Sequence, residues 1–225
     1  MKALHFHLEF GEPLDNAPLV YDATAVQTWP MDQKQPLLDT KPDPDYAHPL
    51  PDHGTVDNPI ADGKAHSGKP YVTVEPYGHT PEGDGLTFNG YVERFVNPDG
   101  SPHVPANMGA VPGTRYGYRN VAVAIRDNGA VSDRIGYEGG VFMSFKIDGE
   151  PATFDQRALS LDSLAKPYHE YELTGYLPDG WHIETGEVAY AYGRDGGSTQ
   201  LVVVNARGEI VTIRKLLDAG VLVAL

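Results

Sequence analysis

The chain has 225 residues, of which 40% are hydrophobic, so it is long enough to bury a core of its own. It contains no cysteine, and its 31 acidic and 17 basic residues give a formal net charge of −14. These values exclude a disulfide framework, a thiolate zinc site and a cysteine nucleophile. They also argue against binding to nucleic acid or anionic membranes, both of which need a basic surface.

The composition favours strands and turns over helices. The chain holds 13 tyrosines and 7 phenylalanines, which are common in strands, and 25 glycines and 19 prolines, which are common in turns. We therefore expect a mainly β fold of the α+β type with few helices. In it, a twisted antiparallel sheet forms the core and a proline-rich, loop-rich N-terminal part packs on that sheet.

Charge and proline divide the chain into two parts. Residues 1–93 hold five lysines, no arginine and 15 acidic residues, a net charge of −10, and 16 of the 19 prolines fall at or before Pro112. The division predicted is an acidic N-terminal region at 1–95 and a second region at 96–225. We expect region 1–95 to pack on the second region without forming an independent domain, its acidic surface serving a partner or delivery component.

The N-terminal residues 4–10 alternate apolar and polar side chains, as a half-buried strand does. His5 and His7 share a face of this strand, but no further ligand is tied to them by spacing, so a solvated face is favoured over a metal site. The same residues interrupt any apolar core of a secretory signal, and no apolar run approaches the ~20 residues that span a bilayer. We expect neither a signal peptide nor membrane insertion.

Residues 13–69 read as a long irregular segment, with histidines at positions 48, 53, 66 and 79 in it and just after it. The neighbouring acids do not follow a D-x-D-x-D-G pattern, so no metal site is expected there either. Two strands are predicted next, at 71–75 and 87–96, the second ended by the turn Asn97–Gly100. A further strand is predicted where Val121, Val123 and Ile125 alternate with other residues before the turn at 127–129.

Functional groups for a charged ligand gather between positions 133 and 201. Arg134 and Arg157 supply planar cationic donors suited to phosphate oxygens, and His169 titrates near neutrality by default. Gln200 follows the diglycine Gly196-Gly197, which permits close approach of backbone to a ligand. The pattern indicates an anion-binding pocket with an amide and a candidate acid or base.

The second region also carries a family resemblance. The ordered blocks "ANMGAVPGT", "SDRIGYEGGVFMS", "QRALSL", "YHEYEL", "GRDGGSTQL" and "EIVTIRKLLDAGVL" are similar to those of the tuberculosis necrotizing toxin domain, a family of NAD-degrading glycohydrolases. The resemblance covers roughly residues 102 to 225. It implies an essential role for Arg134, a central catalytic role for Gln200 and a further catalytic role for His169. The substrate-binding residues expected from the same blocks are Arg157, Phe142, Tyr137, Ile135 and Gly197, with Ile135 standing where the family usually has an aromatic residue.

Each of these residues also has an ordinary structural explanation. The two arginines suit surface ion pairs in an acidic protein, and His169 suits a half-buried position in a strand. Gln200 could simply begin the strand that "LVVV" continues, and aromatic residues such as Tyr137 and Phe142 are more often core than stacking platforms. The ordered set of blocks is what favours the functional interpretation.

The resemblance implies hydrolysis of the nicotinamide–ribose bond of NAD, with NADP as a further candidate substrate. Because nicotinamide leaves as a neutral molecule, no proton donor, metal or other cofactor is required. Two alternatives stay open: an ADP-ribosyltransferase, and a non-catalytic β-rich interaction module. A transferase usually needs a glutamate for its acceptor, and the candidates Glu138, Glu184 and Glu187 form no Glu-x-Glu pair.

The biological setting follows from the resemblance alone. It implies a toxin or effector that is secreted or delivered into a target cell by a separate system and depletes NAD there. It also implies a cognate immunity protein in the producing cell, since an enzyme that destroys NAD must be inhibited in the cell that makes it.

Overall fold

The computed structural model describes residues 26–39, 54–56, 58 and 76–225. The strands expected at 4–10 and 71–75, and the histidines at positions 5, 7, 48, 53 and 66, lie outside these ranges. Among the described residues, no group of three or more His, Cys, Asp or Glu side chains is placed to hold a metal ion. Nor does any helix in those ranges combine the length and apolarity needed to cross a membrane.

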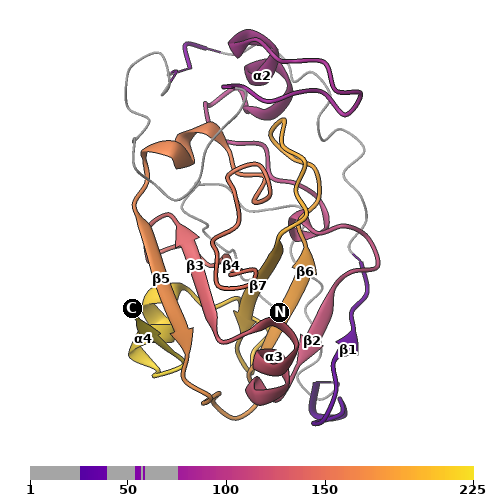
Figure 1. Cartoon of the computed structure of the whole chain (residues 1–225), viewed down its shortest axis with the longest axis vertical. Helices are drawn as coiled ribbons and strands as arrows, with labels where there is room; N and C mark the ends of the chain where they lie inside the picture. Colours follow the sequence, from indigo (N-terminus) through magenta and orange to yellow (C-terminus); the bar gives the residue numbers. More distant parts are fainter. Residues whose placement is uncertain (1–25, 40–53, 57, 59–75) are drawn as a thin grey trace.

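An eight-stranded antiparallel sheet, in the order β1-β2-β6-β7-β4-β3-β5-β8, forms the centre of the described structure (Figure 1). The expectation of a mainly β fold with an antiparallel core is confirmed. The strands are β1 (Gln35–Pro36), β2 (Tyr116–Tyr118), β3 (Val131–Ile135), β4 (Met143–Phe145), β5 (Tyr168–Leu173), β6 (His182–Glu187), β7 (Thr199–Val204) and β8 (Leu222–Ala224).

Strand β7 shows why the sheet forms where it does. Its run of Leu201 and three valines is apolar on both faces, and all four side chains are buried. Leu201 and Val203 join the main core on one face, whereas Val202 and Val204 contact a smaller cluster with Val141 on the other. A strand covered on both faces reads as a continuous apolar run, so β7 takes a central place in the sheet.

Residues 88–95 form a helix, α2 (Phe88–Phe95), so the strand predicted at 87–96 was wrong. The Thr87 hydroxyl accepts a hydrogen bond from the Gly90 amide at 3.1 Å, which caps the N-terminus of the helix. Tyr91, Val92 and Phe95 are buried on one side, because Phe95 follows Val92 by three residues and Tyr91 by four, the spacings that a helix brings together. The turn predicted after it is present, since the Gly100 amide donates to the Asn97 carbonyl at 2.8 Å.

The strand predicted at Val121–Ile125 was also wrong, because these residues form α3 (Val121–Asn128). The Asn120 side chain caps this helix by accepting from the Ala122 amide at 2.9 Å. Gly129, with φ at 92°, ends it in a conformation that favours glycine. The alternating valines predicted a strand because this helix is short. It has too few turns for a helical repeat of apolar residues to be recognised in the sequence.

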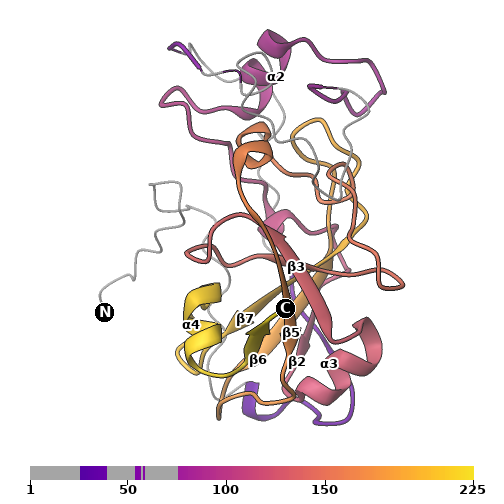
Figure 2. The ribbon, with the colours of Figure 1, turned by 60° about the vertical axis from the view of Figure 1, so that its left-hand side comes forward.

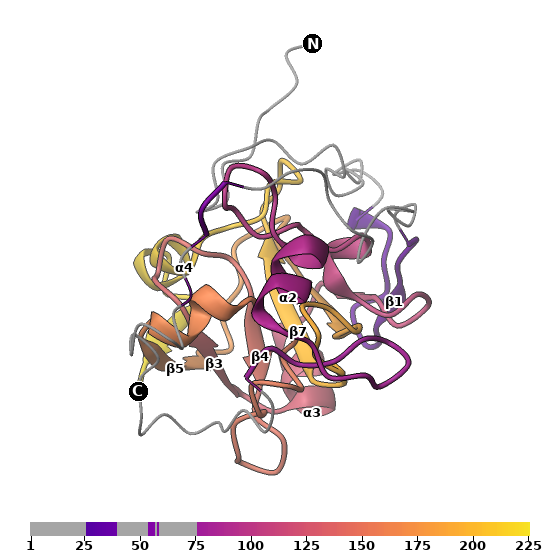
Figure 3. The same ribbon diagram turned by 90° about the horizontal axis from the view of Figure 1, so that it is seen from above.

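The main core joins the sheet to α3 and to α4 (Ile213–Asp218), and a second cluster includes residues of α2. Helix α2 lies beyond the end of the sheet that is opposite to α3 (Figure 2). In the second cluster, Phe95 of α2 packs with residues such as Phe154 and Tyr192. Seen from above, α2 lies over the end of the sheet (Figure 3). The segments that meet at this end of the molecule are the chain around α2, the loop between β4 and β5 and the loop between β6 and β7.

The described N-terminal segments pack on the rest of the fold, as expected. Strand β1 pairs with β2, and the Trp29 ring stands edge-on to His182 with centroids 4.9 Å apart. Arg119 donates to the Trp29 carbonyl at 3.1 Å. The second apolar cluster, in turn, contains α2 side chains from before residue 96 and side chains from far beyond it. The division into regions 1–95 and 96–225 stays a prediction.

Candidate active site

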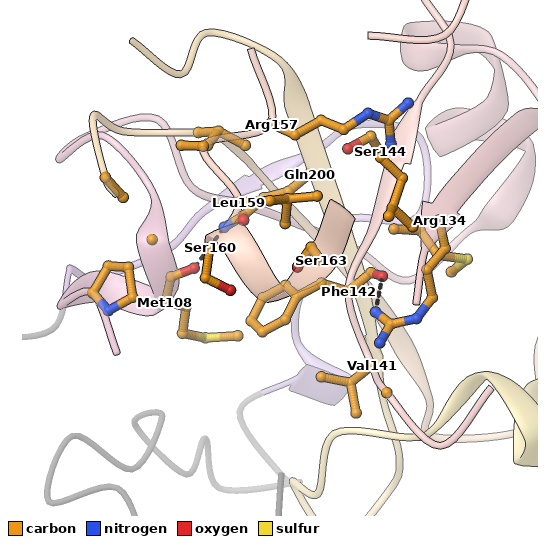
Figure 4. A pocket seen from close by; sticks show the side chains of 18 of the residues that line it. Met108, Arg134, Val141, Phe142, Ser144, Arg157, Leu159, Ser160, Ser163 and Gln200 are labelled. Carbon is orange, nitrogen blue, oxygen red and sulfur yellow. Dashed lines mark hydrogen bonds between the residues drawn. The ribbon is translucent and has the colours of Figure 1, made fainter. Parts of the chain in front are cut away.

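A cavity of about 250 Å³ lies where β3, β4 and β7 meet the loops at one end of the sheet (Figure 4). Its walls are largely apolar and include Met108, Val141, Phe142 and Leu159. A ligand pocket of this kind relies on a few well-placed polar groups for orientation. Those polar groups come mainly from the sheet and from the loops that follow β3 and β4.

Three neighbouring strands place polar side chains on the face of the sheet that lines the cavity. Asp133 on β3 pairs in register with Ser144 on β4, and Ser144 pairs with Gln200 on β7. Side chains at directly opposed positions of antiparallel strands lie on the same face. All three residues line the cavity, so they form a polar row across an otherwise apolar floor.

The charged end of this row is a buried ion pair. Asp133 is fully buried, and its carboxylate accepts two hydrogen bonds from the guanidinium of Arg157, at 2.5 and 2.8 Å. Arg157 also donates from Nε to the Ala152 carbonyl at 2.8 Å. Removing either partner of such a pair leaves a buried charge, which costs about 3–5 kcal/mol. The pair therefore fixes the loop that carries Arg157 against the sheet.

A second carboxylate, Glu170 on β5, lies next to this pair. The Tyr168 hydroxyl is 3.0 Å from an Asp133 oxygen and 2.7 Å from a Glu170 oxygen. Burial of the Tyr168 hydroxyl, together with the two carboxylates, raises its pKa well above the usual range. The hydrogen bond from Tyr168 and the ammonium of Lys146 lower the pKa of Glu170. Tyr168 thus carries a neutral hydroxyl that lies within hydrogen-bond distance of two carboxylates.

Arg134 lies on the opposite face of β3 from Asp133 and reaches the cavity around the loop 136–142. Its Nε donates to the Tyr137 carbonyl at 2.9 Å and its Nη1 donates to the Phe142 carbonyl at 2.7 Å. A Cβ at Gly140 would lie only 1.7 Å from Arg134 Nη2. Glycine at 140 is therefore required for the guanidinium to occupy this position at the rim of the cavity, where Figure 4 shows it.

Gln200 occupies the other end of the polar row. Its Nε2 donates to the Met108 carbonyl at 2.8 Å, across 92 residues of sequence (Figure 4). Met108 belongs to the turn Asn107–Gly109, in which all three residues have positive φ, at 52°, 57° and 74°. This left-handed turn fixes the direction of the Gln200 amide, and it also contributes Met108 and Gly109 to the cavity wall.

The structure brings together five of the eight site residues predicted from the sequence. The cavity is lined by Arg134, Ile135, Phe142, Arg157 and Gln200. Their roles toward a ligand stay predictions. Arg157 does form an ion pair, but a buried one and not the surface pair of the ordinary explanation. Each of its terminal nitrogens carries a second N–H that the pair with Asp133 does not use.

His169, predicted to be catalytic, does not line the cavity. It pairs in register with Arg134, so the alternation of β5 and β3 puts its side chain on the face opposite Asp133. Its ring lies 6.1 Å from that of Tyr171, which belongs to the main core. A catalytic role for His169 remains a prediction that this placement does not favour.

Tyr137 and Gly197 also lie outside the cavity. Tyr137 is 56% exposed, and its backbone carbonyl, not its ring, contacts Arg134. Gly197 is exposed, and its amide donates to the Val188 carbonyl at 2.7 Å. At Gly196 a Cβ would lie 2.2 Å from that carbonyl. The diglycine therefore allows close packing of backbone on backbone in this structure, rather than approach to the cavity.

Sequence reasoning missed Asp133, Ser144 and Met108. Asp133 and Ser144 stand in strands next to residues that were singled out, and strand alternation would place both on one face once the register is known. A fully buried aspartate also needs a partner, which points to an arginine such as Arg157. No local signal identifies Met108, because its contribution is a backbone carbonyl in a left-handed turn.

Comparison with known proteins agrees with this fold. The family model described as Tuberculosis necrotizing toxin matches residues 127–225. The "Outer membrane channel protein CpnT" of Mycobacterium tuberculosis and that of Mycobacterium bovis are each 38% identical over 194 residues, 83% of this chain. The chain spans 23% of the length of these relatives.

A solved structure of tuberculosis necrotizing toxin complexed with its immunity factor IFT matches with a TM-score of 0.72 and 37% identity. The match covers 84% of this chain and 98% of that one. The chain therefore belongs to the tuberculosis necrotizing toxin family.

Proposed function

We propose that the chain is an NAD glycohydrolase, which cleaves the nicotinamide–ribose bond of NAD with water and releases nicotinamide and ADP-ribose. The observation that carries this proposal is the arrangement of Gln200 and Arg134 around one largely apolar cavity. The cavity offers an oriented neutral amide at one side and a permanent cation at the other, with the Phe142 ring between them in the view of Figure 4. Family membership supports the same activity.

The chemistry suits these groups. Nicotinamide leaves NAD as a neutral molecule, so the reaction needs no general acid, unlike the hydrolysis of an ordinary glycoside. The protein has to hold the dinucleotide, exclude bulk water and stabilise an oxocarbenium-like transition state. A neutral amide such as that of Gln200 can orient the ribose or the attacking water without trapping the electrophile, as a carboxylate nucleophile would.

We assign the remaining groups by their charge and position. Arg134 contacts the pyrophosphate, because its guanidinium lies at the rim of the cavity and is held by backbone carbonyls. Arg157 contributes mainly by holding Asp133, with a pyrophosphate contact through its second N–H groups. Phe142 packs against the nicotinamide ring.

Transfer of ADP-ribose to a protein is less well supported. Among the described residues that line the cavity, Asp133 is the sole carboxylate, and it is paired with Arg157. None of the three glutamates weighed from the sequence, Glu138, Glu184 and Glu187, lines the cavity. Glu184 pairs with Arg115 at 2.8 Å, and Glu138 pairs with Arg214 at 2.5 Å. Neither is placed to activate an acceptor in the cavity.

The test is incubation of the purified chain with NAD, and in parallel with NADP, followed by chromatography of the products and mass spectrometry of the protein. We expect nicotinamide and ADP-ribose in equal amounts, with unmodified protein. ADP-ribosylated protein would identify a transferase instead. Unchanged NAD under all conditions would leave the non-catalytic interaction module as the better description.

We further propose that the chain acts as a toxin that is delivered into a target cell and is neutralised by a cognate immunity protein. The solved relative is complexed with its immunity factor, and the CpnT relatives are named as outer membrane channel proteins. The proposal predicts that a cell expressing the active chain loses NAD, whereas a cell that also expresses the immunity protein keeps it.

A further inference from the structure

The left-handed turn Asn107–Gly109 is a strained element next to the cavity. Asn107 and Met108 have φ values of 52° and 57°, a region that L-residues other than glycine rarely occupy. Such a conformation costs about 1–2 kcal/mol per residue and persists only where the surroundings hold it in place. Asn is among the residues that tolerate it best, whereas Met is not.

The side chain of Asn107 holds the turn from within. It is buried, and its Nδ2 donates to the Ala110 carbonyl and to Asp39 Oδ1, both at 3.0 Å. Asp39 comes from the described N-terminal segment 26–39, and its other oxygen accepts from the Gly113 amide at 2.8 Å. One exposed carboxylate therefore ties both ends of the loop 107–113.

Arg115 holds the turn from behind. It is 2% exposed, and its Nη1 lies 3.4 Å from Asn107 Oδ1 and donates at 3.1 Å to the Leu38 carbonyl. Its Nη2 lies 3.4 Å from Met108 Sδ and donates at 2.8 Å to Glu184 Oε2 on β6. The planar guanidinium group has several N–H donors in fixed directions, so it can contact all of these partners at the same time. A lysine ammonium cannot.

The turn is joined to Gln200 by one hydrogen bond, in which the Met108 carbonyl accepts from Gln200 Nε2. That hydrogen bond directs one end of the Gln200 amide, and so directs its Oε1 as well. The direction of the Gln200 side chain thus depends on the strained backbone conformation of residues 107–109. That conformation is held in place by Arg115, Asn107 and Asp39.

We propose that Arg115, Asn107 and Asp39 are positioning residues that lock the turn Asn107–Gly109 so that the Met108 carbonyl orients the Gln200 amide for NAD cleavage. The effect of these residues on the rate of NAD cleavage rests on the proposed function. Through Asp39, the N-terminal segment has a part in the site, although no residue of that segment lines the cavity among the residues described.

The test compares three variants with one control. Asp39→Ala removes an exposed carboxylate, Asn107→Gly keeps the left-handed backbone without its side-chain bonds, and Arg115→Lys keeps a cation beside Glu184 without the fork. Asp32→Ala, an exposed aspartate in the same segment, is the control. Each is measured for kcat and KM with NAD, for melting temperature, and for the side-chain amide NMR signal of Gln200.

We expect kcat to fall roughly tenfold in the three variants at nearly constant KM, because a misplaced group near the reacting atoms loses rate more than affinity. The Gln200 amide signal should move in each of them and stay unchanged in Asp32→Ala. Wild-type kcat with an unmoved Gln200 signal in all three would overturn the proposal, as would a lower melting temperature with that signal unmoved. If wild-type protein leaves NAD intact, the proposed function fails, and the NMR signal still decides whether these residues orient Gln200.

Discussion

At the scale of single residues, the candidate site depends on two groups that are held by backbone carbonyls. Arg134 donates to the carbonyls of Tyr137 and Phe142, and Gln200 donates to that of Met108. Carbonyl partners orient a donor. The positions of both side chains are therefore fixed before a ligand binds, which is the arrangement that electrostatic catalysis requires.

Gln200→Ala and Arg134→Ala should each lower kcat/KM for NAD by roughly 100-fold or more, because each removes a contact made in the transition state. Melting temperatures should stay close to that of the wild type, since neither side chain belongs to an apolar core cluster. Gln33→Ala and Arg126→Ala change exposed residues of the same types and serve as controls. Wild-type rates in both site variants would remove these residues from the proposed site.

The lowered pKa of Glu170 predicts a pH-dependent contribution to stability. Since the folded pKa lies below the unfolded value of about 4.3, the contribution is present above that pH and is lost as pH falls through the folded pKa. Glu170→Gln should therefore lower the free energy of unfolding in urea at neutral pH, by at most about 1 kcal/mol for a partly exposed group. The difference from wild type should shrink as the medium is acidified.

Glu172→Gln is the matched control for that measurement, because Glu172 lies on the same strand and is exposed. A loss of stability in Glu170→Gln that is the same at neutral and acidic pH would show that the hydrogen bond from Tyr168 and the ion pair with Lys146 do not stabilise the ionised form.

At the scale of elements, the loop 136–142 is shaped around the Arg134 side chain. Gly140→Ala should displace the guanidinium, because the added Cβ would lie 1.7 Å from Nη2. We expect activity with NAD to fall about as far as in Arg134→Ala, roughly 100-fold. Gly54→Ala, where a Cβ meets nothing within 4 Å, is the control. Full activity in Gly140→Ala would mean that the observed position of Arg134 is not the active one.

Strand positions could be predicted where apolar or aromatic runs are long, as at β5 and β7, and the turn Asn97–Gly100 followed from its residues. Helices α2 and α3 could not, because each has only eight residues and depends on a cap and on tertiary burial. Sequence and resemblance singled out Arg134 and Gln200, which both line the cavity, while their roles stay predictions. They could not show that His169 faces away from Asp133, since that depends on strand register.

At the scale of the whole molecule, the described N-terminal segments pack against the rest of the fold. Tyr91, Val92 and Phe95 of α2 are buried in the second apolar cluster, and β1 extends the sheet at one edge. Asp39 adds a tether to the wall of the cavity.

Truncation to residues 97–225 should give an aggregated or unfolded protein, because it removes the three α2 side chains and exposes the apolar surface that they cover. Size-exclusion chromatography and circular dichroism of the fragment would report this. A soluble, folded and fully active fragment would show that residues 1–96 form a separate module.

Metal chelation should leave turnover unchanged, since the proposed mechanism uses a neutral leaving group and needs no Lewis acid. The measurement is the initial rate of NAD cleavage with and without EDTA. Activity that is lost with EDTA and restored by calcium or zinc would show that a metal ion takes part in the reaction and that the proposed mechanism is wrong.

The central claim is that NAD is cleaved in the cavity between Gln200 and Arg134, and a crystal structure of the Gln200→Ala variant with NAD tests it most directly. We predict intact NAD in the cavity, with its nicotinamide ribose beside position 200, its nicotinamide against Phe142 and its pyrophosphate at Arg134. An empty cavity at saturating NAD, or NAD bound elsewhere on the chain, would contradict the claim.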